Sequence, residues 1–331
     1  MIEDVVRPAT PAAATEREWR EELLTLLERS VSAFCALEHR VFRNAAHRFN
    51  AVAACIHELS ACLHLLEAAG IGRETIAMMV APARALCARS PFVARLQHWP
   101  RGYAGDFETI EYIAAGRNQA PPDTVAYAIE EYALNCAPAC QHRNKLAEQV
   151  RRIQQVCRVT KRPRILVLGA GGGLDLWLAL PDLAASQATL VVNDHDPDAL
   201  ALCARRLGDL GPAVTLLSAN VLTLRDQIQA HGPYDLILAG GLFDYIPDRH
   251  LRRLIRRLIA ALTPESGRLF FTNIVEAHPF ECQLRYLGSW ELIGRAEQNI
   301  QAICASETQP VHVTITRDVS GLTYLVDVRP R

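Results

Sequence analysis

Ile165-Leu166-Val167-Leu168-Gly169-Ala170-Gly171-Gly172-Gly173-Leu174-Asp175-Leu176 is the stretch that decides the fold. Its apolar start predicts a buried strand, its alternating glycines a tight turn, and its apolar end the first turn of a helix. A second apolar run, Leu190-Val191-Val192, follows and ends in Asn193-Asp194, which predicts a second strand tipped with an acid. Strand, glycine turn, helix and acid-tipped strand in this order form a nucleoside-binding unit.

The spacing of the glycines indicates the kind of nucleoside. A dinucleotide site has the pattern G-x-G-x-x-G, in which the third glycine lets the helix pack closely on the strand. Gly169, Gly171 and Gly173 depart from it, because Leu174 occupies the position of the third glycine. A bulky residue there disfavours a pyrophosphate and favours a ligand with an amino-acid end. The sequence therefore predicts S-adenosylmethionine (SAM) rather than NAD as the cofactor, with the Asp194 carboxylate accepting both ribose hydroxyls.

Composition narrows the function classes. The chain has 331 residues, half of them apolar, and a formal net charge of −1. It is long enough for one large or two ordinary domains, and the absence of a basic excess argues against nucleic acid and anionic membrane surfaces as partners. With no apolar run of membrane length and no leader pattern, a cytoplasmic protein is expected.

The cysteines indicate a reducing compartment. There are ten, none in a C-x-x-C pair, as expected for inert buried thiols. Cys136, Cys140 and His142 lie close in sequence, but no second pair of ligands follows them. We therefore predict no metal site.

Hydrophobic periodicity predicts an α/β protein. Apolar stripes at helical spacing predict a helical bundle in the N-terminal part. Strands alternating with helices then predict a Rossmann-like doubly wound, mainly parallel sheet, closed by an antiparallel C-terminal edge. We expect a disordered tail over residues 1–14, a helical cap and substrate domain over 15–158, and a SAM-binding domain over 159–331. The cap is expected to close the substrate pocket. The strand candidates are 164–168, 189–193, 213–217, 234–238, 268–273, 311–315 and 322–328.

Ligands of doubly wound sheets bind beyond the carboxyl ends of the strands, so the residues after each strand are candidates for the site. His195 is expected to cover the adenine beside Asp194, and Asn220 and Val221 to contact it. Asn220 is also typical of a turn. Gly240 and Leu242 are expected at the methionine end, with Asp244 and Tyr245 facing the reaction centre. Tyr245 could equally be a packed aromatic residue.

Further segments carry a resemblance. Residues 90 to 300 resemble class I SAM-dependent methyltransferases. Four segments resemble one subgroup, the bacterial extracellular-factor enzymes of 3-hydroxypalmitic acid methyl ester biosynthesis. These are Arg101-Gly102-Tyr103-Ala104-Gly105-Asp106-Phe107, Gln141-His142-Arg143-Asn144-Lys145, Gly241-Leu242-Phe243-Asp244-Tyr245 and Tyr286-Leu287-Gly288-Ser289-Trp290-Glu291-Leu292-Ile293-Gly294-Arg295. The chain departs from the pattern at Asn220, where many methyltransferases have Asp, and at Gly294, where an aromatic is commoner.

The resemblance implies a carboxyl O-methyltransferase. A carboxylate is already ionised at neutral pH and needs only a cation or hydrogen-bond donors to orient it, for which the candidates are Arg143, Arg285 and His142. An amine, phenol or carbon nucleophile would need a base, and Asp106, Asp244, His142 or Tyr103 could serve.

Roles for the remaining residues follow from their positions. The glycine-flanked loop with Tyr103 and Asp106 is interpreted as a flap over the methionine end of SAM, or else as a turn in which Asp106 caps the next helix. Arg143 is expected to pair with the SAM carboxylate, or else to lie on a solvated helix face. Candidate catalytic residues are Tyr103, Asp106, His142 and Tyr245; candidate substrate contacts are Asp244, Tyr245, Arg285, Tyr286 and Trp290.

The sequence thus predicts methyl transfer to a small metabolite, with a carboxylate oxygen as first choice. N-, C- or O-methylation of an amino-acid-like or aromatic secondary metabolite is the alternative, and a non-catalytic SAM-binding regulator is a second. A homodimer is compatible with each of these functions. Leu174 disfavours an NAD-dependent oxidoreductase. Gly241-Leu242-Phe243-Asp244, in place of an Asn/Asp-Pro-Pro-Tyr/Phe motif, disfavours a nucleic-acid methyltransferase.

Overall fold

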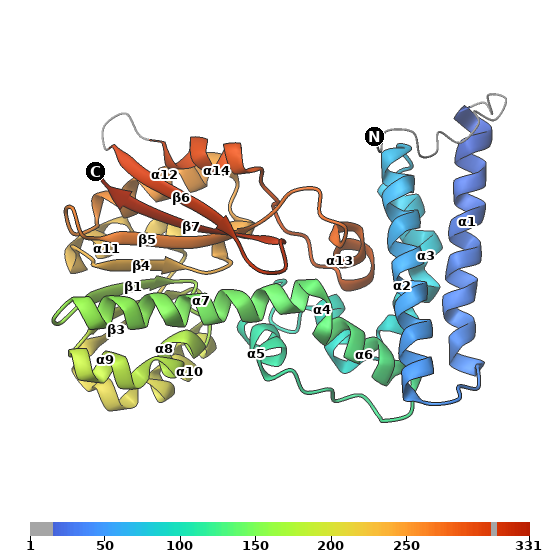
Figure 1. Ribbon diagram of the computed structural model, residues 1–331, viewed down its shortest axis with the longest axis horizontal. Coiled ribbons are helices and arrows are strands. Elements are labelled where there is room, and N and C mark those ends of the chain that lie inside the picture. Colours follow the sequence, from blue (N-terminus) through green and yellow to red (C-terminus); the bar gives the residue numbers. More distant parts are fainter. Residues whose placement is uncertain (1–15, 306–309) are drawn as a thin grey trace, which may run out of the picture. The chain divides into compact units, whose positions relative to one another are not determined.

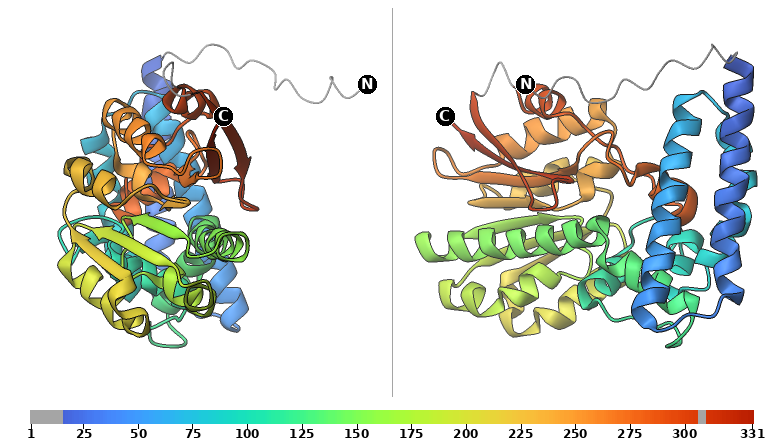
Figure 2. Two further views of the ribbon diagram at one scale, coloured as in Figure 1. Left: turned by 90° about the vertical axis from the view of Figure 1, so that its left-hand side faces the viewer. Right: turned by 45° about the vertical axis from the view of Figure 1, so that its right-hand side comes forward.

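The computed structural model describes residues 16–305 and 310–331, which divide into two compact units (Figures 1 and 2). The first unit comprises residues up to His98 together with Asn118–Ala133 and Pro279–Trp290; the second comprises Trp99–Arg117, Leu134–His278 and Glu291–Arg331. Residues 99–117 and 134–158, which the sequence analysis assigned to the helical part, thus group with the sheet. The expected tail, residues 1–14, lies outside the described residues.

The first unit is helical. Its elements are α1 (Glu16–Ala36), the 3₁₀ turn η1 (Leu37–His39), α2 (Ala45–Ala68), α3 (Arg73–Cys87), α4 (Pro91–His98), most of α6 (Val125–Asn135) and α13 (Glu281–Gly288). The apolar stripes of α1 and α2 form the interior, as Leu27, Phe34, Leu59 and Leu63 are fully buried. Within the described residues, α2 alone has the length and apolar composition to cross a membrane; its buried stripe packs in this bundle as a core helix does.

The second unit contains one seven-stranded sheet. Its strands are β1 (Arg164–Leu168), β2 (Thr189–Asp194), β3 (Val214–Ser218), β4 (Leu236–Ala239), β5 (Arg268–Ile274), β6 (Val311–Arg317) and β7 (Thr323–Pro330). They lie in the order β3-β2-β1-β4-β5-β7-β6. The first five are parallel, and β7 is antiparallel to both β5 and β6. This confirms the predicted doubly wound sheet with an antiparallel C-terminal edge.

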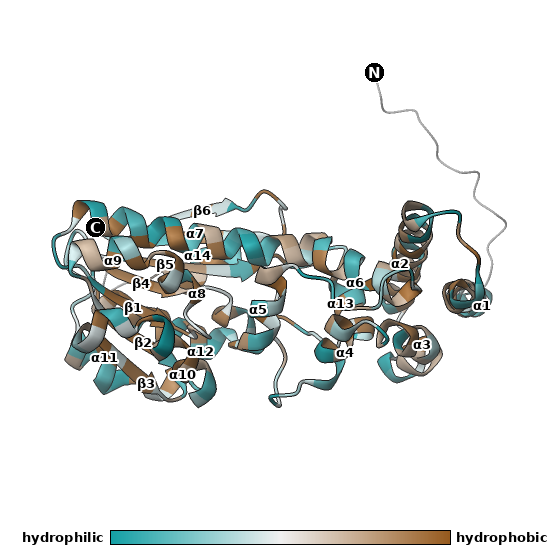
Figure 3. Ribbon diagram, turned by 90° about the horizontal axis from the view of Figure 1, so that it is seen from below, coloured by the Kyte–Doolittle hydropathy of each residue, from teal (hydrophilic) through white to brown (hydrophobic). Residues whose placement is uncertain are grey.

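Helices cover both faces of the sheet, because neighbouring strand residues point to opposite sides. Ile165 and Val167 pack in a buried cluster with α7 (Ala137–Val159), α8 (Leu174–Leu178), α9 (Leu180–Ser186) and α10 (Pro197–Arg206). Leu166 and Leu168 pack in a second cluster with α11 (Arg225–His231), α12 (Asp248–Ala260) and α14 (Glu297–Cys304). In Figure 3 the apolar strands lie between helices whose outer faces are polar. The remaining elements are α5 (Phe107–Ala115) and the 3₁₀ turns η2 (Gly208–Ala213), η3 (Val221–Thr223) and η4 (Leu242–Tyr245).

Helix α7 is held along the sheet by polar contacts with the C-terminal hairpin. Its Asn144 amide donates to Asp318 Oδ2 at 2.7 Å, and its Arg152 guanidinium donates to Asp327 Oδ2 at 2.6 Å. Arg152 also contacts Glu148 on its own helix at 2.9 Å. These contacts fix the helix beside the turns that follow β1 and β4, so the side chains on its facing surface have defined positions at the end of the sheet.

Candidate cofactor and active site

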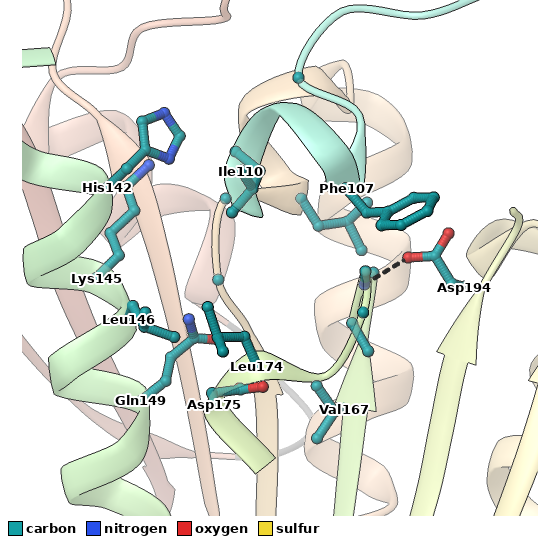
Figure 4. A pocket seen from close by; sticks show the side chains of 18 of the residues that line it. Phe107, Ile110, His142, Lys145, Leu146, Gln149, Val167, Leu174, Asp175 and Asp194 are labelled. Carbon is teal, nitrogen blue, oxygen red and sulfur yellow. Dashed lines mark hydrogen bonds between the residues drawn. The ribbon is translucent and has the colours of Figure 1, made fainter. Parts of the chain in front are cut away.

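A cavity of about 380 Å³ lies at the carboxyl ends of the parallel strands in the second unit (Figure 4). Its walls come from the turns after β1, β2 and β4, from the loop and first turns of α5, and from α7. This is the edge at which ligands of doubly wound sheets bind. The volume is within the range of small-molecule sites.

The glycine turn after β1 requires glycine for conformation and for space. Gly169, Gly171 and Gly173 have φ angles of +58°, +54° and +63°, the left-handed region that other residues rarely adopt. A Cβ on Gly171 would lie 3.2 Å from the Phe107 Cβ, and one on Gly173 would lie 2.6 Å from the Cys203 Sγ. Gly169 and Gly171 line the cavity, whereas Gly173 serves the packing of α8 on α10.

Asp194 is held in place beside the glycine turn by two main-chain hydrogen bonds. Its Oδ2 accepts the Gly171 N–H at 2.8 Å, and its Oδ1 accepts the Asp196 N–H at 2.9 Å. The residue is 6% exposed and lines the cavity. Each carboxylate oxygen retains capacity for a further donor, so the arrangement fits two ribose hydroxyls. The glycine turn and the acid are thus one hydrogen-bonded unit.

The loop before α5 closes over this end. Arg101 donates to Asp196 from Nε and Nη2 at 2.5 and 2.7 Å, and to Asp198 at 2.6 Å. These bonds from Arg101 lower the pKa of Asp196 to about 2. The Tyr103 hydroxyl donates to Asp196 at 3.1 Å, and its ring lies 4.7 Å from the His195 ring. Tyr103 therefore lies on the side of the cavity where Asp194 and His195 stand. Which part of SAM it covers stays a prediction.

The opposite wall of the cavity is one face of α7. His142, Lys145 and Gln149 all line it, at a spacing that places them along the same side of the helix. The Lys145 ammonium lies 3.1 Å from Asp244 Oδ2, and the two side chains are 3% and 2% exposed. The other oxygen of Asp244 accepts the Ile274 N–H at 2.7 Å. This buried ion pair stands over the Gly240–Gly241 turn, where a Cβ on Gly240 would meet the Gln149 amide.

His142 is kept uncharged by its surroundings. Burial, together with the cations Lys145 and Arg143, lowers its pKa well below 6.5. The neutral imidazole has one nitrogen that can accept a proton. Tyr103 is unsuited to that role, because burial and the charge of Asp196 raise its pKa and keep the phenol protonated.

Several predicted site residues do not line the cavity and have other partners. Arg143 donates to the Ile113 and Leu134 carbonyls at 3.1 and 2.9 Å. Asp106 caps α5 by accepting the Thr109 N–H at 2.8 Å, the capping role that the sequence left open. Asn220 caps η3 by accepting the Leu222 N–H at 2.9 Å, and Val221 is buried in the core.

Three predicted substrate contacts belong to the first unit. Arg285 and Tyr286 both bind Glu67, at 2.6 and 2.7 Å, and Trp290 is 4% exposed. The predicted site residues that line the cavity of the second unit are Tyr103, His142, Gly169, Gly171, Asp194, His195, Gly240, Leu242, Asp244 and Tyr245.

Sequence reasoning missed the helical contributions. It did not propose Lys145 or Gln149 from α7, Ile110 or Glu111 from α5, or Leu292. The spacing of His142, Lys145 and Gln149, three and four residues apart, was the available signal for α7, because it marks one helix face. Arg143, which sequence reasoning favoured, is one residue from His142 and so points in a different direction.

Comparisons with known proteins agree with this geometry. Residues 166–269 match the model of a methyltransferase domain, the segment from β1 to the start of β5 that carries the glycine turn, Asp194 and the Gly240–Gly241 turn. The chain is an enzyme, a SAM-dependent methyltransferase. SAM is therefore its cofactor, as predicted. The cavity offers groups of the kinds that SAM requires, which are glycine backbone, a buried carboxylate and an ammonium.

One similar solved structure shares the fold, and others have a lower similarity. A "possible exported protein" from Bordetella parapertussis is 16% identical, with 96% of this chain and 98% of that chain covered and a TM-score of 0.54. An O-methyltransferase family protein from Burkholderia thailandensis is 17% identical over 96% and 99% of the two chains, with a TM-score of 0.46. Magnesium protoporphyrin IX methyltransferase from Synechocystis, solved with S-adenosylhomocysteine (SAH), is 13% identical over 67% and 93%, with a TM-score of 0.47. No curated protein sequence matches the chain.

Proposed function

We propose that this methyltransferase binds SAM across the cavity of the second unit and transfers its methyl group to a small molecule. The adenosine would lie at Asp194 and His195, and the amino-acid end at Lys145. The observation that carries this proposal is a pair of opposite charges on opposite sides of one cavity, Asp194 and Lys145 (Figure 4). A carboxylate suits ribose hydroxyls, and an ammonium suits the carboxylate of the methionine part.

The roles of the chain's residues follow from what SAM supplies. Bound SAM provides a methyl group already activated by its sulfonium, so the protein has to align the acceptor rather than activate the donor. Lys145 would fix the amino-acid end, and Tyr103 would cover the nucleoside end. His142 and Tyr245 would then bound the space for the acceptor, with Leu292 supplying apolar contact.

Two of the segments that resemble the extracellular-factor enzymes have roles in the fold, so the resemblance does not require a shared methyl acceptor. Arg101 of the first segment binds Asp196 and Asp198, and Arg143 of the second binds two carbonyls. Both residues have structural partners that do not depend on a fatty acyl substrate. We therefore propose a small organic acceptor and do not extend the proposal to the 3-hydroxypalmitic acid ester.

The assignment of Lys145 can be tested with two ligands. SAH carries the amino-acid end, whereas 5′-methylthioadenosine lacks it. Calorimetric titration should show that the variant Lys145→Met/Asp244→Asn, which removes both charges, binds SAH at least tenfold more weakly than the wild type. Its affinity for methylthioadenosine should be unchanged. Equal losses for both ligands would contradict the assignment, and no binding of SAH by the wild type would contradict the proposed function.

Turnover separates the enzyme from a SAM-binding regulator, which would bind SAH without producing it from SAM. The remaining expectations from sequence stand as proposals of the same kind. They are a cytoplasmic location, the homodimer as a compatible assembly, and no nucleic-acid or membrane partner.

A further inference from the structure

The charges on the cavity wall indicate which class of methyl acceptor the site favours. Four carboxyl side chains line the cavity, those of Glu111, Asp175, Asp194 and Asp244, against the single ammonium of Lys145. Asp244 pairs with Lys145 at 3.1 Å, and Glu111 pairs with Arg206, which lies outside the lining, at 2.5 and 2.7 Å. The wall is acidic overall, which favours the positively charged sulfonium of SAM and disfavours an anion beside it.

Among the cavity-lining residues of the second unit, Lys145 is the one Lys or Arg that an anionic acceptor would meet. Arg143, expected to orient a carboxylate, does not line the cavity and donates to two carbonyls. The carboxylate of SAM itself would compete for Lys145. An ionised acid brought next to Asp244 would then be desolvated against a like charge, which is costly in a buried site.

A proton acceptor stands in the same wall. His142 lies one turn from Lys145 on the same face of α7 (Figure 4). Both residues line the cavity, as do Tyr245 and Leu292. The charged groups that act on the pKa of His142 are Lys145 and Arg143 on its own helix. The other titratable side chains that line the same cavity are those of Tyr103, Glu111, Asp175, Asp194, His195, Asp244 and Tyr245. A neutral imidazole so placed can take up a proton from the acceptor, and a carboxylate nucleophile carries no proton to remove.

We infer that the acceptor is an uncharged hydroxyl, phenol or amine, and that His142 removes its proton. This inference rests on the proposed function and names the substrate class of the same site. The acceptor heteroatom forms a bond to the methyl carbon with its lone pair. The bond between that carbon and sulfur breaks, its electron pair neutralises the sulfonium to give SAH, and the acceptor's proton passes to the imidazole and then to water.

The stability of the product to alkali distinguishes the two acceptor classes. The full-length protein is incubated with SAM labelled in its methyl group and a small-molecule cell extract, and the labelled products are treated with mild alkali. A methyl ester releases labelled methanol, whereas a methyl ether or N-methyl group does not. Label that resists alkali is the expected result, and label released as methanol would overturn the inference. No transfer of label at all would contradict the proposed function on which it rests.

The role of His142 is tested by a matched pair of histidine substitutions. His142→Gln should lower kcat by about a hundredfold or more while SAH affinity stays within twofold of the wild type. His195→Gln, at the nucleoside end, should instead raise the KM for SAM with a small change in kcat. Equal kcat for His142→Gln and wild type would overturn the assignment. A His142→Gln protein with lost SAH affinity would also overturn it, because the residue would then hold the cofactor.

Discussion

The two ends of the cavity are built in different ways. At the end proposed for the nucleoside, Asp194 accepts backbone N–H groups from Gly171 and Asp196, so main-chain turns at adjacent strand ends define the site. At the other end, side chains from α7 meet Asp244 from the turn after β4, and the contact joins residues 99 positions apart. The first end is specified by local sequence. The second depends on where a helix packs, and a buried ion pair holds it together.

The largest effect is expected from breaking that ion pair alone. Lys145→Met leaves the Asp244 carboxylate buried without its cation, which should lower the free energy of unfolding by about 3–5 kcal/mol. Urea denaturation followed by circular dichroism measures the change. Lys161→Met, at an exposed position, is the matched control and should change stability by less than about 0.5 kcal/mol. If Lys145→Met lost little unfolding free energy, the ion pair would not stabilise this end of the cavity.

Removing both charges should separate stability from binding. Lys145→Met/Asp244→Asn eliminates the uncompensated carboxylate, while the Asn side-chain oxygen can still accept the Ile274 N–H. The double variant should therefore be more stable than Lys145→Met in the same urea titration. A double variant as unstable as the single one would mean that the lysine stabilises the fold through its packing rather than its charge.

A smaller effect is expected at the nucleoside end. Asp194→Asn keeps the size of the side chain but replaces one acceptor oxygen by a donor and removes the charge. The affinity for SAH should fall by about ten- to a hundredfold, as expected for a lost hydrogen bond to a charged group. Isothermal titration calorimetry checks this, with Asp209→Asn on the exposed η2 turn as control. Unchanged affinity would refute the ribose assignment.

The glycine turn provides a test of packing at the same end. Gly173→Ala combines a left-handed φ of +63° with a Cβ 2.6 Å from the Cys203 sulfur. We expect a loss of about 1–3 kcal/mol in unfolding free energy. The control is Gly208→Ala, where no atom lies within 4 Å of the added Cβ. Thermal unfolding that is equal for the two variants would contradict the packing role of Gly173.

The smallest effect concerns the loop over the nucleoside end. Arg101 lowers the pKa of Asp196 to about 2, below the unfolded value near 4. The resulting stability is therefore present above about pH 4 and is lost as the pH falls toward 2. Arg101→Gln should remove about 1 kcal/mol at pH 6, and the difference from the wild type should shrink at pH 3. Unfolding curves at both values check this. A difference that is independent of pH would exclude the ion pair as its cause.

The sequence predicted the sheet because β1, β2 and β4 are continuous apolar runs. It predicted cavity-lining residues such as Asp194 because they follow those strands directly. It did not predict Lys145, whose function depends on the rotation of α7 against the sheet. Arg143 and Asp106 were assigned to the site because their chemistry suited it. Their side chains instead satisfy backbone groups, Arg143 at two carbonyls and Asp106 at the Thr109 N–H. A polar side chain near a helix end can bind a ligand or a backbone group. The local sequence does not distinguish these two roles, because the same residue types serve both.

The central claim is that one SAM molecule spans the two ends of the cavity. A crystal structure of the full chain with SAH tests it most directly. The account predicts both ribose hydroxyls within hydrogen-bond distance of the Asp194 carboxylate and the homocysteine carboxylate within hydrogen-bond distance of the Lys145 ammonium. SAH bound with its amino-acid end away from α7, or elsewhere on the protein, would contradict it.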